Sequence, residues 1–139
     1  MSISQNIRDA VYAKCAGRCA YCGSELNGKF QVDHVISQRN FEHRIKNQFR
    51  VPEFLKHLTL VDVNHIDNLL PACASCNNYK STHDLEGFRK ELGLLIERLN
   101  KTSSIYRIAK RFGSIKEMDQ PIRFYFEDLS VSRLNIEAA

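Results

Sequence analysis

Four of the five cysteines stand in two Cys-x-x-Cys pairs, and they are Cys19, Cys22, Cys73 and Cys76. Four thiolates in this arrangement are the ligand set of a structural zinc ion, which prefers tetrahedral sulfur coordination. A redox-active dithiol needs only one pair and is expected in a βαβ context, which argues against that interpretation. A rubredoxin-like or iron-sulfur centre remains an alternative, because iron accepts the same four ligands. Cys15 is expected to be a small buried residue.

The interval between the two pairs contains oxygen and imidazole side chains, which suit a different chemistry. Asp33 and His34 lie in Val-Asp-His-Val, Asn68 lies in Asp-Asn-Leu-Leu, and Asn77 directly follows Cys76. Hydrolysis of a phosphodiester needs a base that takes a proton from water and a hard divalent cation that neutralises the developing charge. These side-chain types can supply the base and hold the cation.

In this order the motifs resemble the zinc-bearing, four-cysteine branch of the HNH endonucleases, whose catalytic unit is the ββα-metal, or His-Me, finger. The resemblance covers about Ile7 to Lys80. It implies that His34 is the general base and that Asn68 and Asn77 are the second and third motif positions. Asp33 and Asn77 then resemble the pair that binds catalytic Mg²⁺ or Mn²⁺. The resemblance also implies DNA as substrate and 5′-phosphate and 3′-hydroxyl products, with RNA as an alternative substrate.

Elementary chemistry agrees with these roles. An imidazole with an ordinary pKa of about 6.5 is mostly neutral at about pH 7 and can accept a proton. Mg²⁺ prefers a carboxylate and other oxygen ligands while it keeps several waters. Adjacent strand residues point to opposite faces, so Asp33 and His34 can act on one phosphate only if the strand is distorted. Asn68 is expected to hold the His34 loop through backbone hydrogen bonds.

Each motif residue also has an ordinary structural interpretation. Taken alone, His34 would be a hydrogen-bonded core histidine, Asn68 a turn residue and Asn77 a helix cap. Only the complete motif order favours the catalytic interpretation. The chain departs from the commonest family pattern in the long distance from His34 to Asn68 and in the missing proline after Val-Asp-His-Val-Ile. The long distance predicts an insertion over about residues 37–65.

Four more residues are candidates for the site. Arg39 and Arg44 follow the His34 strand and are candidates for contact with the DNA backbone. Lys80 is a candidate phosphate contact, and a solvated helix lysine is the alternative. His65 lies three residues before Asn68 and is a candidate cleft residue, as a metal ligand, a phosphate contact or a second base, with an ordinary loop histidine as the alternative.

The bulk composition limits the remaining possibilities. The chain has 139 residues, 43% of them hydrophobic and 26% charged, which is typical of one globular domain spanning 1–139. No segment resembles a membrane span or a signal peptide, so a cytoplasmic protein without a membrane partner is expected. Basic residues outnumber acidic ones five to two over Gln38 to Lys56. This excess fits a phosphate-rich partner, and solvated helix faces are the alternative.

The hydrophobic pattern predicts the elements around the motifs. A helix over Gln5 to Lys14, capped by Ser4, should lead into the first cysteine pair. Strands are expected over Phe30 to Ile36 and Asn68 to Ala72, with a short helical stretch after Pro52. The second cysteine pair should begin a helix.

A helical extension is expected over about residues 83–139. Ser81 or Thr82 should cap a helix whose apolar face runs from Leu85 to Leu99 and must be buried, in the core or in an oligomer interface. Ser103 or Ser104 should cap the next helix. Alternation at Ile122, Phe124 and Phe126 predicts a half-buried strand.

The predicted architecture is one α+β domain: a ββα-metal finger over about residues 7–82, a four-cysteine zinc site, and a helical tail that ends in a short strand. The predicted function is metal-dependent hydrolysis of DNA, by nicking or double-strand cleavage. The sequence is compatible with a phage or mobile-element nuclease and with an antiviral effector that works beside an ATPase partner. The alternative from another class is a catalytically silent zinc module that binds nucleic acid or a protein.

Overall fold

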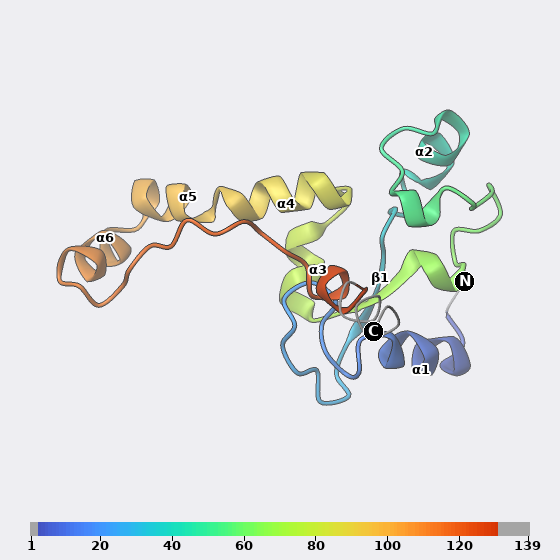
Figure 1. The fold of residues 1–139 in the computed structure, drawn as a ribbon, viewed down its shortest axis with the longest axis horizontal. Helices are drawn as coiled ribbons and strands as arrows, with labels where there is room; N and C mark the ends of the chain where they lie inside the picture. Colours follow the sequence, from blue (N-terminus) through green and yellow to red (C-terminus); the bar gives the residue numbers. More distant parts are fainter. Residues whose placement is uncertain (1–2, 131–139) are drawn as a thin grey trace, which may run out of the picture.

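A two-stranded antiparallel sheet followed by a helix lies at the centre of the fold (Figure 1). The computed structural model describes residues 3–130. In it, strand β1 (Gln31–His34) pairs with β2 (Leu69–Ala72), and helix α3 (Ala74–Lys80) follows β2 directly and packs on β1. The register places Asp33 opposite Leu70 and His34 opposite Leu69. Both strands therefore lie close to their predicted positions. The helix begins at the second cysteine pair, as predicted.

The N-terminal helix α1 (Gln5–Lys14) has the predicted bounds. Its N-cap is Ser4, whose hydroxyl accepts a hydrogen bond from the backbone N–H of Ile7. The helix packs against β2, and the ammonium group of Lys14 donates to the carbonyls of Ile66 and Leu69 at 2.8 and 2.7 Å. Burial lowers the pKa of Lys14. These bonds fasten α1 to the turn that enters β2.

The predicted insertion is a packed part of the core. It contains helix α2 (Phe41–Asn47), which the sequence pattern did not reveal, and the 3₁₀ turn η1 (Glu53–Leu55), which is the helical stretch expected after Pro52. A second 3₁₀ turn, η2 (Ile66–Asn68), leads into β2. The apolar side chains of this segment that are buried in the core are Phe41, Ile45, Val51, Leu55 and Leu58. Their burial holds a segment with little regular structure in place.

Helix α4 (Leu85–Gly93) begins later than predicted. Its N-cap is Asp84, whose carboxylate accepts a hydrogen bond from the backbone N–H of Gly87 at 2.8 Å, so the prediction of Ser81 or Thr82 was wrong. Ser81 instead ends α3 with a positive φ of 51°, whereas an N-cap residue typically has an extended backbone. A carboxylate is also a better partner than a hydroxyl for the positive end of the helix dipole.

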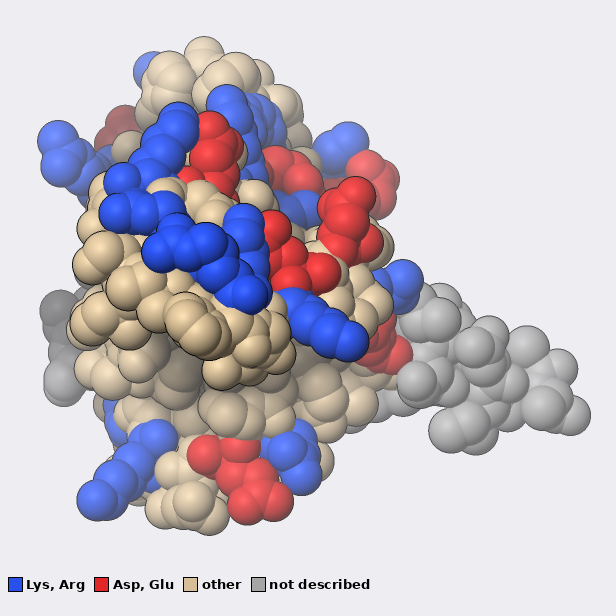
Figure 2. Space-filling view, turned by 90° about the vertical axis from the view of Figure 1, so that its left-hand side faces the viewer, with Lys and Arg blue, Asp and Glu red and all other residues tan. Residues whose placement is uncertain are grey.

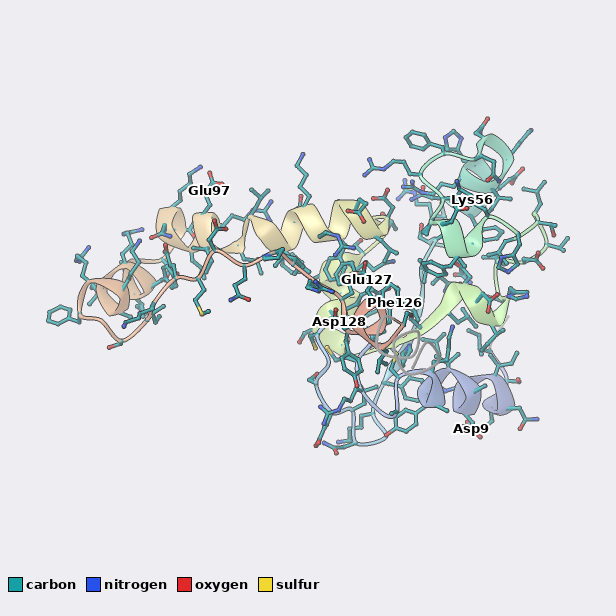
Figure 3. The ribbon with its side chains drawn as sticks, viewed as in Figure 1. Asp9, Lys56, Glu97, Phe126, Glu127 and Asp128 are labelled. Carbon is teal, nitrogen blue, oxygen red and sulfur yellow. The ribbon has the colours of Figure 1, made fainter. Side chains whose placement is uncertain are left out.

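The predicted apolar face from Leu85 to Leu99 is buried only in its first half. Phe88 is fully buried, whereas Leu99 is 38% exposed, and α5 (Leu95–Thr102) contains no buried residue. The helix breaks at Leu94, and α5 and α6 (Ser104–Arg111) form an arm that extends from the body (Figure 1). Glu97 on α5 points away from the body (Figure 3). The N-cap of α6 is Ser103, as predicted.

The strand expected at Ile122, Phe124 and Phe126 is not formed, which corrects that prediction. The chain is irregular up to Phe124 and helical over 125–130. The backbone N–H groups of Tyr125 and Phe126 donate to carbonyls of the first cysteine loop, at Tyr21 and Ala20. Phe124 is 1% exposed and its ring stands edge-on to Tyr21 at 5.2 Å. Aromatic burial, rather than strand pairing, fixes this segment.

The segment that follows the arm, residues 122–127, is held in place by an ion-pair cluster around Arg89. The guanidinium group of Arg89 on α4 donates to the carbonyl of Ile122 at 2.7 Å and to both carboxylate oxygens of Glu127 at 2.9 and 3.0 Å. The same group lies 4.4 Å from the centre of the Phe124 ring. Phe126, Glu127 and Asp128 consequently lie next to the first cysteine loop, near the centre of the molecule (Figure 3). No helix within residues 3–130 has the length and apolar character needed to cross a bilayer.

Candidate metal centre and the adjoining hollow

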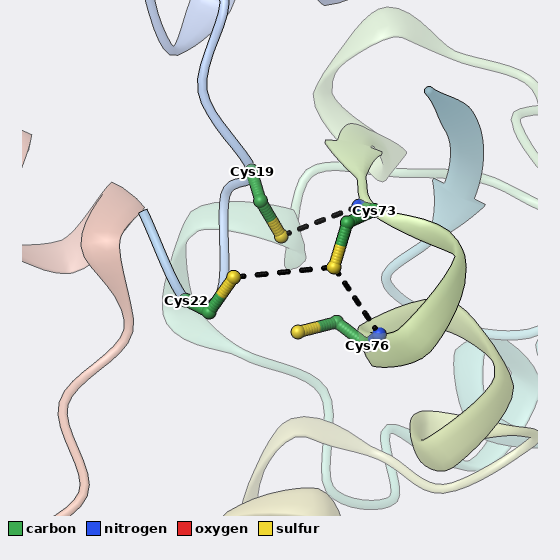
Figure 4. A group of neighbouring side chains, drawn as sticks. All are labelled: Cys19, Cys22, Cys73 and Cys76. Atoms are coloured by element: carbon green, nitrogen blue, oxygen red, sulfur yellow. Dashed lines mark hydrogen bonds between the residues drawn. The ribbon is translucent and has the colours of Figure 1, made fainter. Parts of the chain in front are cut away.

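The four paired cysteines converge, as their spacing predicts (Figure 4). Cys19 and Cys22 lie on the loop after α1, and Cys73 and Cys76 lie at the start of α3. The four sulfur atoms lie within 4.8 Å of one another, and the Cys22 and Cys73 sulfurs are 3.9 Å apart. A tetrahedral zinc ion with bonds of about 2.3 Å requires sulfur separations of about 3.8 Å. The cluster therefore has the size and ligand type of a zinc site.

Backbone N–H groups around the cluster favour thiolate. The N–H of Cys73 donates to the Cys19 sulfur at 3.4 Å, and the N–H of Cys76 donates to the Cys73 sulfur at 3.4 Å. The pKa of Cys19 falls to about 4, first because the Cys76 thiol donates to it and then because backbone N–H groups do. The hydrogen bond to Cys19, then burial and the Cys19 negative charge, raise the pKa of Cys76. Four thiols cannot all ionise this close together without a cation, so the cluster fits a divalent metal.

The loop that presents Cys19 and Cys22 is a tight turn closed by backbone bonds. The N–H of Gly23 donates to the Cys19 carbonyl at 2.9 Å, and Gly23 has φ of 76°. A Cβ atom at this position would meet the ring of Tyr125 at 3.2 Å. Glycine therefore serves both the turn conformation and the close packing of the C-terminal segment. Cys15 is 1% exposed, as expected, and does not belong to the cluster.

Three of the four predicted catalytic residues lie around one surface hollow beside α3. We call it the His34 hollow, and its volume is about 310 Å³. It is lined by Val32, Asp33, His34, Ser37, Gln38, Arg39, Asn77, Ser81 and Thr82. The pairing of β1 with β2 is regular at Asp33 and His34, so the strand distortion that we expected is not seen. Both residues nevertheless line the hollow, at the end of β1.

Asp33 is a buried carboxylate that already has two partners. It is 5% exposed, and its Oδ2 atom accepts a hydrogen bond from the hydroxyl of Tyr21 and lies 3.2 Å from the ammonium nitrogen of Lys80. Burial raises the pKa of Asp33 above its ordinary value, and the nearby charge of Lys80 opposes this shift. Both contacts involve Oδ2, so Oδ1 is the oxygen that is left for another ligand.

Lys80 does not have the role of a surface phosphate contact that the sequence suggested. Its side chain is completely buried, and it pairs with Asp33 and donates to the carbonyl of His34 at 3.0 Å. A lysine that faces away from solvent cannot reach a nucleic acid, which overturns that prediction. The residue instead ties the end of α3 to both motif residues of β1.

Two asparagines position His34 and the loop after it. Asn68 is fully buried; its amide oxygen accepts from the N–H of Ile36 at 2.9 Å, and its amide nitrogen donates to the carbonyls of Ile36 and Val63 at 3.2 and 2.9 Å. These are the backbone bonds that the sequence predicted. The other is Asn64, whose Oδ1 lies 2.8 Å from Nε2 of His34. Sequence reasoning missed Asn64, because it belongs to no motif.

Asn77 and Arg39 also line the His34 hollow, and Asn77 donates its amide hydrogen to Gln31. Arg39 is exposed, which keeps it available as a DNA contact. The side chain of Arg44 is only 13% exposed and pairs with Asp84 at 3.6 Å, so its charge is largely committed within the protein.

His65 does not line the hollow. Its Nδ1 atom accepts from the N–H of Asp67 at the start of η2. The prediction that it is a cleft residue is therefore not supported by its position. A larger hollow of about 800 Å³ lies between α1, η1 and residues 125–130, and its lining includes two motif residues, Asp67 and Leu70.

The arm carries much of the surface charge. Figure 2, which faces the end of the arm, shows Lys and Arg side chains in a band across the upper part of the molecule, with acidic side chains among them. Three of the basic residues of α5 and α6 pair with acidic neighbours: Arg98 with Glu91, Lys101 with Glu97, and Lys110 with Glu117. The band is therefore a mixed surface, as expected of solvated helix faces.

Comparison with protein-family models, with curated proteins and with solved structures finds no match for this chain. The structure is a mixed α and β fold with a four-cysteine cluster suited to zinc and a polar hollow that is lined by an imidazole, a carboxylate and an amide.

Proposed function

We propose that the chain is a metal-dependent endonuclease of the HNH type that hydrolyses DNA phosphodiester bonds. The observation that carries the proposal is the His34 hollow, where Asp33, His34 and Asn77 meet beside the four-cysteine cluster. A core histidine or a helix cap would not require these three residues to share one surface. The hollow is open to solvent, as a site for a polymeric substrate must be.

His34 is the proposed general base. With the amide oxygen of Asn64 facing it at 2.8 Å, Nε2 carries the ring hydrogen and donates, so Nδ1 holds the free lone pair. Asn68 fixes the loop that follows, because its side chain bonds both the N–H and the carbonyl of Ile36 and also donates to the carbonyl of Val63. The two asparagines thus determine which ring nitrogen takes the proton from water and where the ring lies.

Asp33 and Asn77 would hold the hard divalent ion, through Oδ1 of the carboxylate and the amide oxygen. Such an ion, Mg²⁺ or Mn²⁺, would neutralise charge on the phosphate and on the leaving oxygen. Lys80 already neutralises Asp33, so the protein offers a cation little net negative charge of its own. The substrate phosphate would have to supply the remaining ligand charge, as is common for Mg²⁺ sites. We therefore expect tight ion binding only with DNA present.

A plasmid-nicking assay tests the proposal. The zinc-loaded native chain is compared with His34→Ala and with His43→Ala, which removes an exposed histidine of α2 that lies outside the hollow. We expect Mg²⁺- or Mn²⁺-dependent nicking that falls at least about 100-fold in His34→Ala and is unchanged in His43→Ala. Absence of native nicking with either ion, or equal nicking by His34→Ala, would contradict the proposal.

The alternative proposal is a silent zinc module that binds nucleic acid or a protein. The commitment of Asp33 to Lys80 and Tyr21 favours it, because a carboxylate with two partners is a weaker metal ligand. Retarded migration of DNA in a gel, without cleavage in any divalent ion, is the result that this alternative predicts.

A further inference from the structure

A second group of metal-ligating side chains lies outside the His34 hollow, on the segment between η1 and β2. The group consists of His57, His65 and Asp67, whose ligand atoms lie within 4.8 Å of one another. Nε2 of His57 is 2.9 Å and Nδ1 of His65 is 3.7 Å from the same carboxylate oxygen, Oδ2 of Asp67. The two imidazole rings stand edge-on with centroids 5.6 Å apart.

These separations suit a common metal ion. Nitrogen and oxygen ligands at about 2.0–2.2 Å from a tetrahedral zinc ion lie about 3.3–3.6 Å from one another. The two separations in the structure, 2.9 and 3.7 Å, lie just below and just above this range, so a bound ion would move the His57 nitrogen slightly away from Asp67. A simple ion pair with Asp67 would engage one histidine. A second imidazole at the same carboxylate oxygen points to a shared cation, which would replace the hydrogen bond that Nδ1 of His65 accepts from the backbone N–H of Asp67.

The backbone that carries the three ligands is held before any ion binds. Lys14 donates to the carbonyls of Ile66 and Leu69 on either side of Asp67, and Asn68 is fully buried. On the other side, Leu58 next to His57 is 4% exposed and anchors that end of the segment. The backbone therefore needs little rearrangement, and the main cost of binding is the hydrogen bond from the Asp67 N–H to His65 that the ion replaces.

The ligand side chains are also accessible to an ion from solution. Their exposed fractions are 53% for His57, 37% for His65 and 45% for Asp67. The nearby carboxylate of Asp62 accepts hydrogen bonds from the backbone and hydroxyl of Thr59, so it is already occupied. The site thus offers three protein ligands and keeps a fourth position for water.

We propose that His57, His65 and Asp67 form a second metal site, which binds a divalent transition metal such as Zn²⁺, Co²⁺ or Ni²⁺. Two imidazoles with one carboxylate suit these borderline ions, whereas Mg²⁺ and Ca²⁺ prefer oxygen ligands alone. The ion links the end of η1 to η2 and so closes the segment that contains Asn64, the partner of His34. This proposal does not depend on nuclease activity.

Calorimetric titration of the native chain with Zn²⁺ or Co²⁺, after the four-cysteine site has been filled with zinc, tests the site. We expect one further equivalent to bind. His57→Gln and Asp67→Asn should each weaken this binding at least about tenfold, and His43→Gln, a matched change at an exposed histidine, should not affect it. Excess Zn²⁺ should raise the melting temperature of the native chain and of His43→Gln, but not that of His57→Gln.

Thiol titration and circular dichroism establish that each variant is folded with one thiolate-bound zinc. Failure of the native chain to take a second equivalent overturns the proposal, and so does equal binding by His57→Gln. Equal loss of binding in His43→Gln also overturns it, because His43 lies outside the group. Cobalt bound at the second site should lack the sulfur charge-transfer absorption of a thiolate site, which separates it from exchange into the cysteine cluster.

Discussion

The buried ion pair between Lys80 and Asp33 gives the sharpest test of how this fold is held together. Lys80→Met keeps most of the side-chain volume and removes the charge. At the observed separation of 3.2 Å, the attraction between the two charges is about 5 kcal/mol for an effective dielectric constant of about 20. The variant leaves Asp33 in the interior with only the Tyr21 hydrogen bond, and it leaves the His34 carbonyl without its 3.0 Å donor.

We expect Lys80→Met to lower the free energy of unfolding by about 3–5 kcal/mol, the usual cost of removing one partner from a buried pair. The exposed control Lys90→Met should change it by less than about 0.5 kcal/mol. Urea unfolding of the zinc-loaded proteins, followed by circular dichroism, measures both values. Asp33→Asn in the Lys80→Met background should recover part of the loss, because no unpaired buried charge then remains.

The pH dependence provides an independent check. Burial already raises the folded-state pKa of Asp33, and the charge of Lys80 limits the increase. A pKa raised on folding means that the contribution of Asp33 to stability falls as the pH rises from its ordinary pKa towards the raised one. Removing Lys80 raises the pKa further and extends this loss to higher pH. The deficit of Lys80→Met should therefore be larger at about pH 8 than at about pH 5. A deficit that is small, or the same at both pH values, would refute the reasoning.

Three further outcomes are expected. Asn68→Ala should destabilise the chain by at least about 2 kcal/mol in urea unfolding, because it leaves two buried backbone groups of Ile36 and the half-buried carbonyl of Val63 without their partner. A change within error would show that water replaces the amide. Cys22→Ser should lower the amount of zinc bound per chain, measured by metal analysis. The control Cys15→Ala should retain one zinc ion. Equal loss of zinc in both variants would place Cys15 at the metal. Phe112→Ser on the arm should leave the melting temperature unchanged, since its side chain is 83% exposed, and a marked decrease would indicate that the arm is covered in solution.

Zinc removal has an outcome that follows from the topology. The cysteine cluster joins the loop after α1 to the start of α3, and the sheet between them has only two strands. Such a small sheet rarely holds a fold by itself. A strong chelator should therefore abolish the cooperative unfolding transition, and persistence of that transition without zinc would show that the aromatic core suffices.

Local sequence signals determined the parts of this protein that depend on neighbouring residues. Cysteine spacing located the metal cluster, Ser4 and Ser103 located two helix starts, and the buried Asn68 made the backbone bonds expected of it. At the two helix starts a short stretch of chain contains both the capping side chain and the backbone N–H that it satisfies, so capping chemistry is enough to predict them. The cysteine pairs and Asn68 meet partners 51 and 32 positions away, and they were predictable because ligand type and motif order indicate them.

Only the tertiary structure decided which partners the remaining side chains meet. Lys80 has the sequence position of a surface residue, yet it is buried, because a carboxylate 47 positions earlier in the chain needs a counter-charge in the core. The aromatic residues near Phe124 alternate as in a strand, but Phe124 packs on Tyr21 instead. Asn64 meets His34, and His57 and His65 meet Asp67, only through the way the chain folds before β2. Long-range burial and charge pairing override local periodicity at these positions, because desolvation costs depend on what surrounds a group in space and not on its neighbours in sequence.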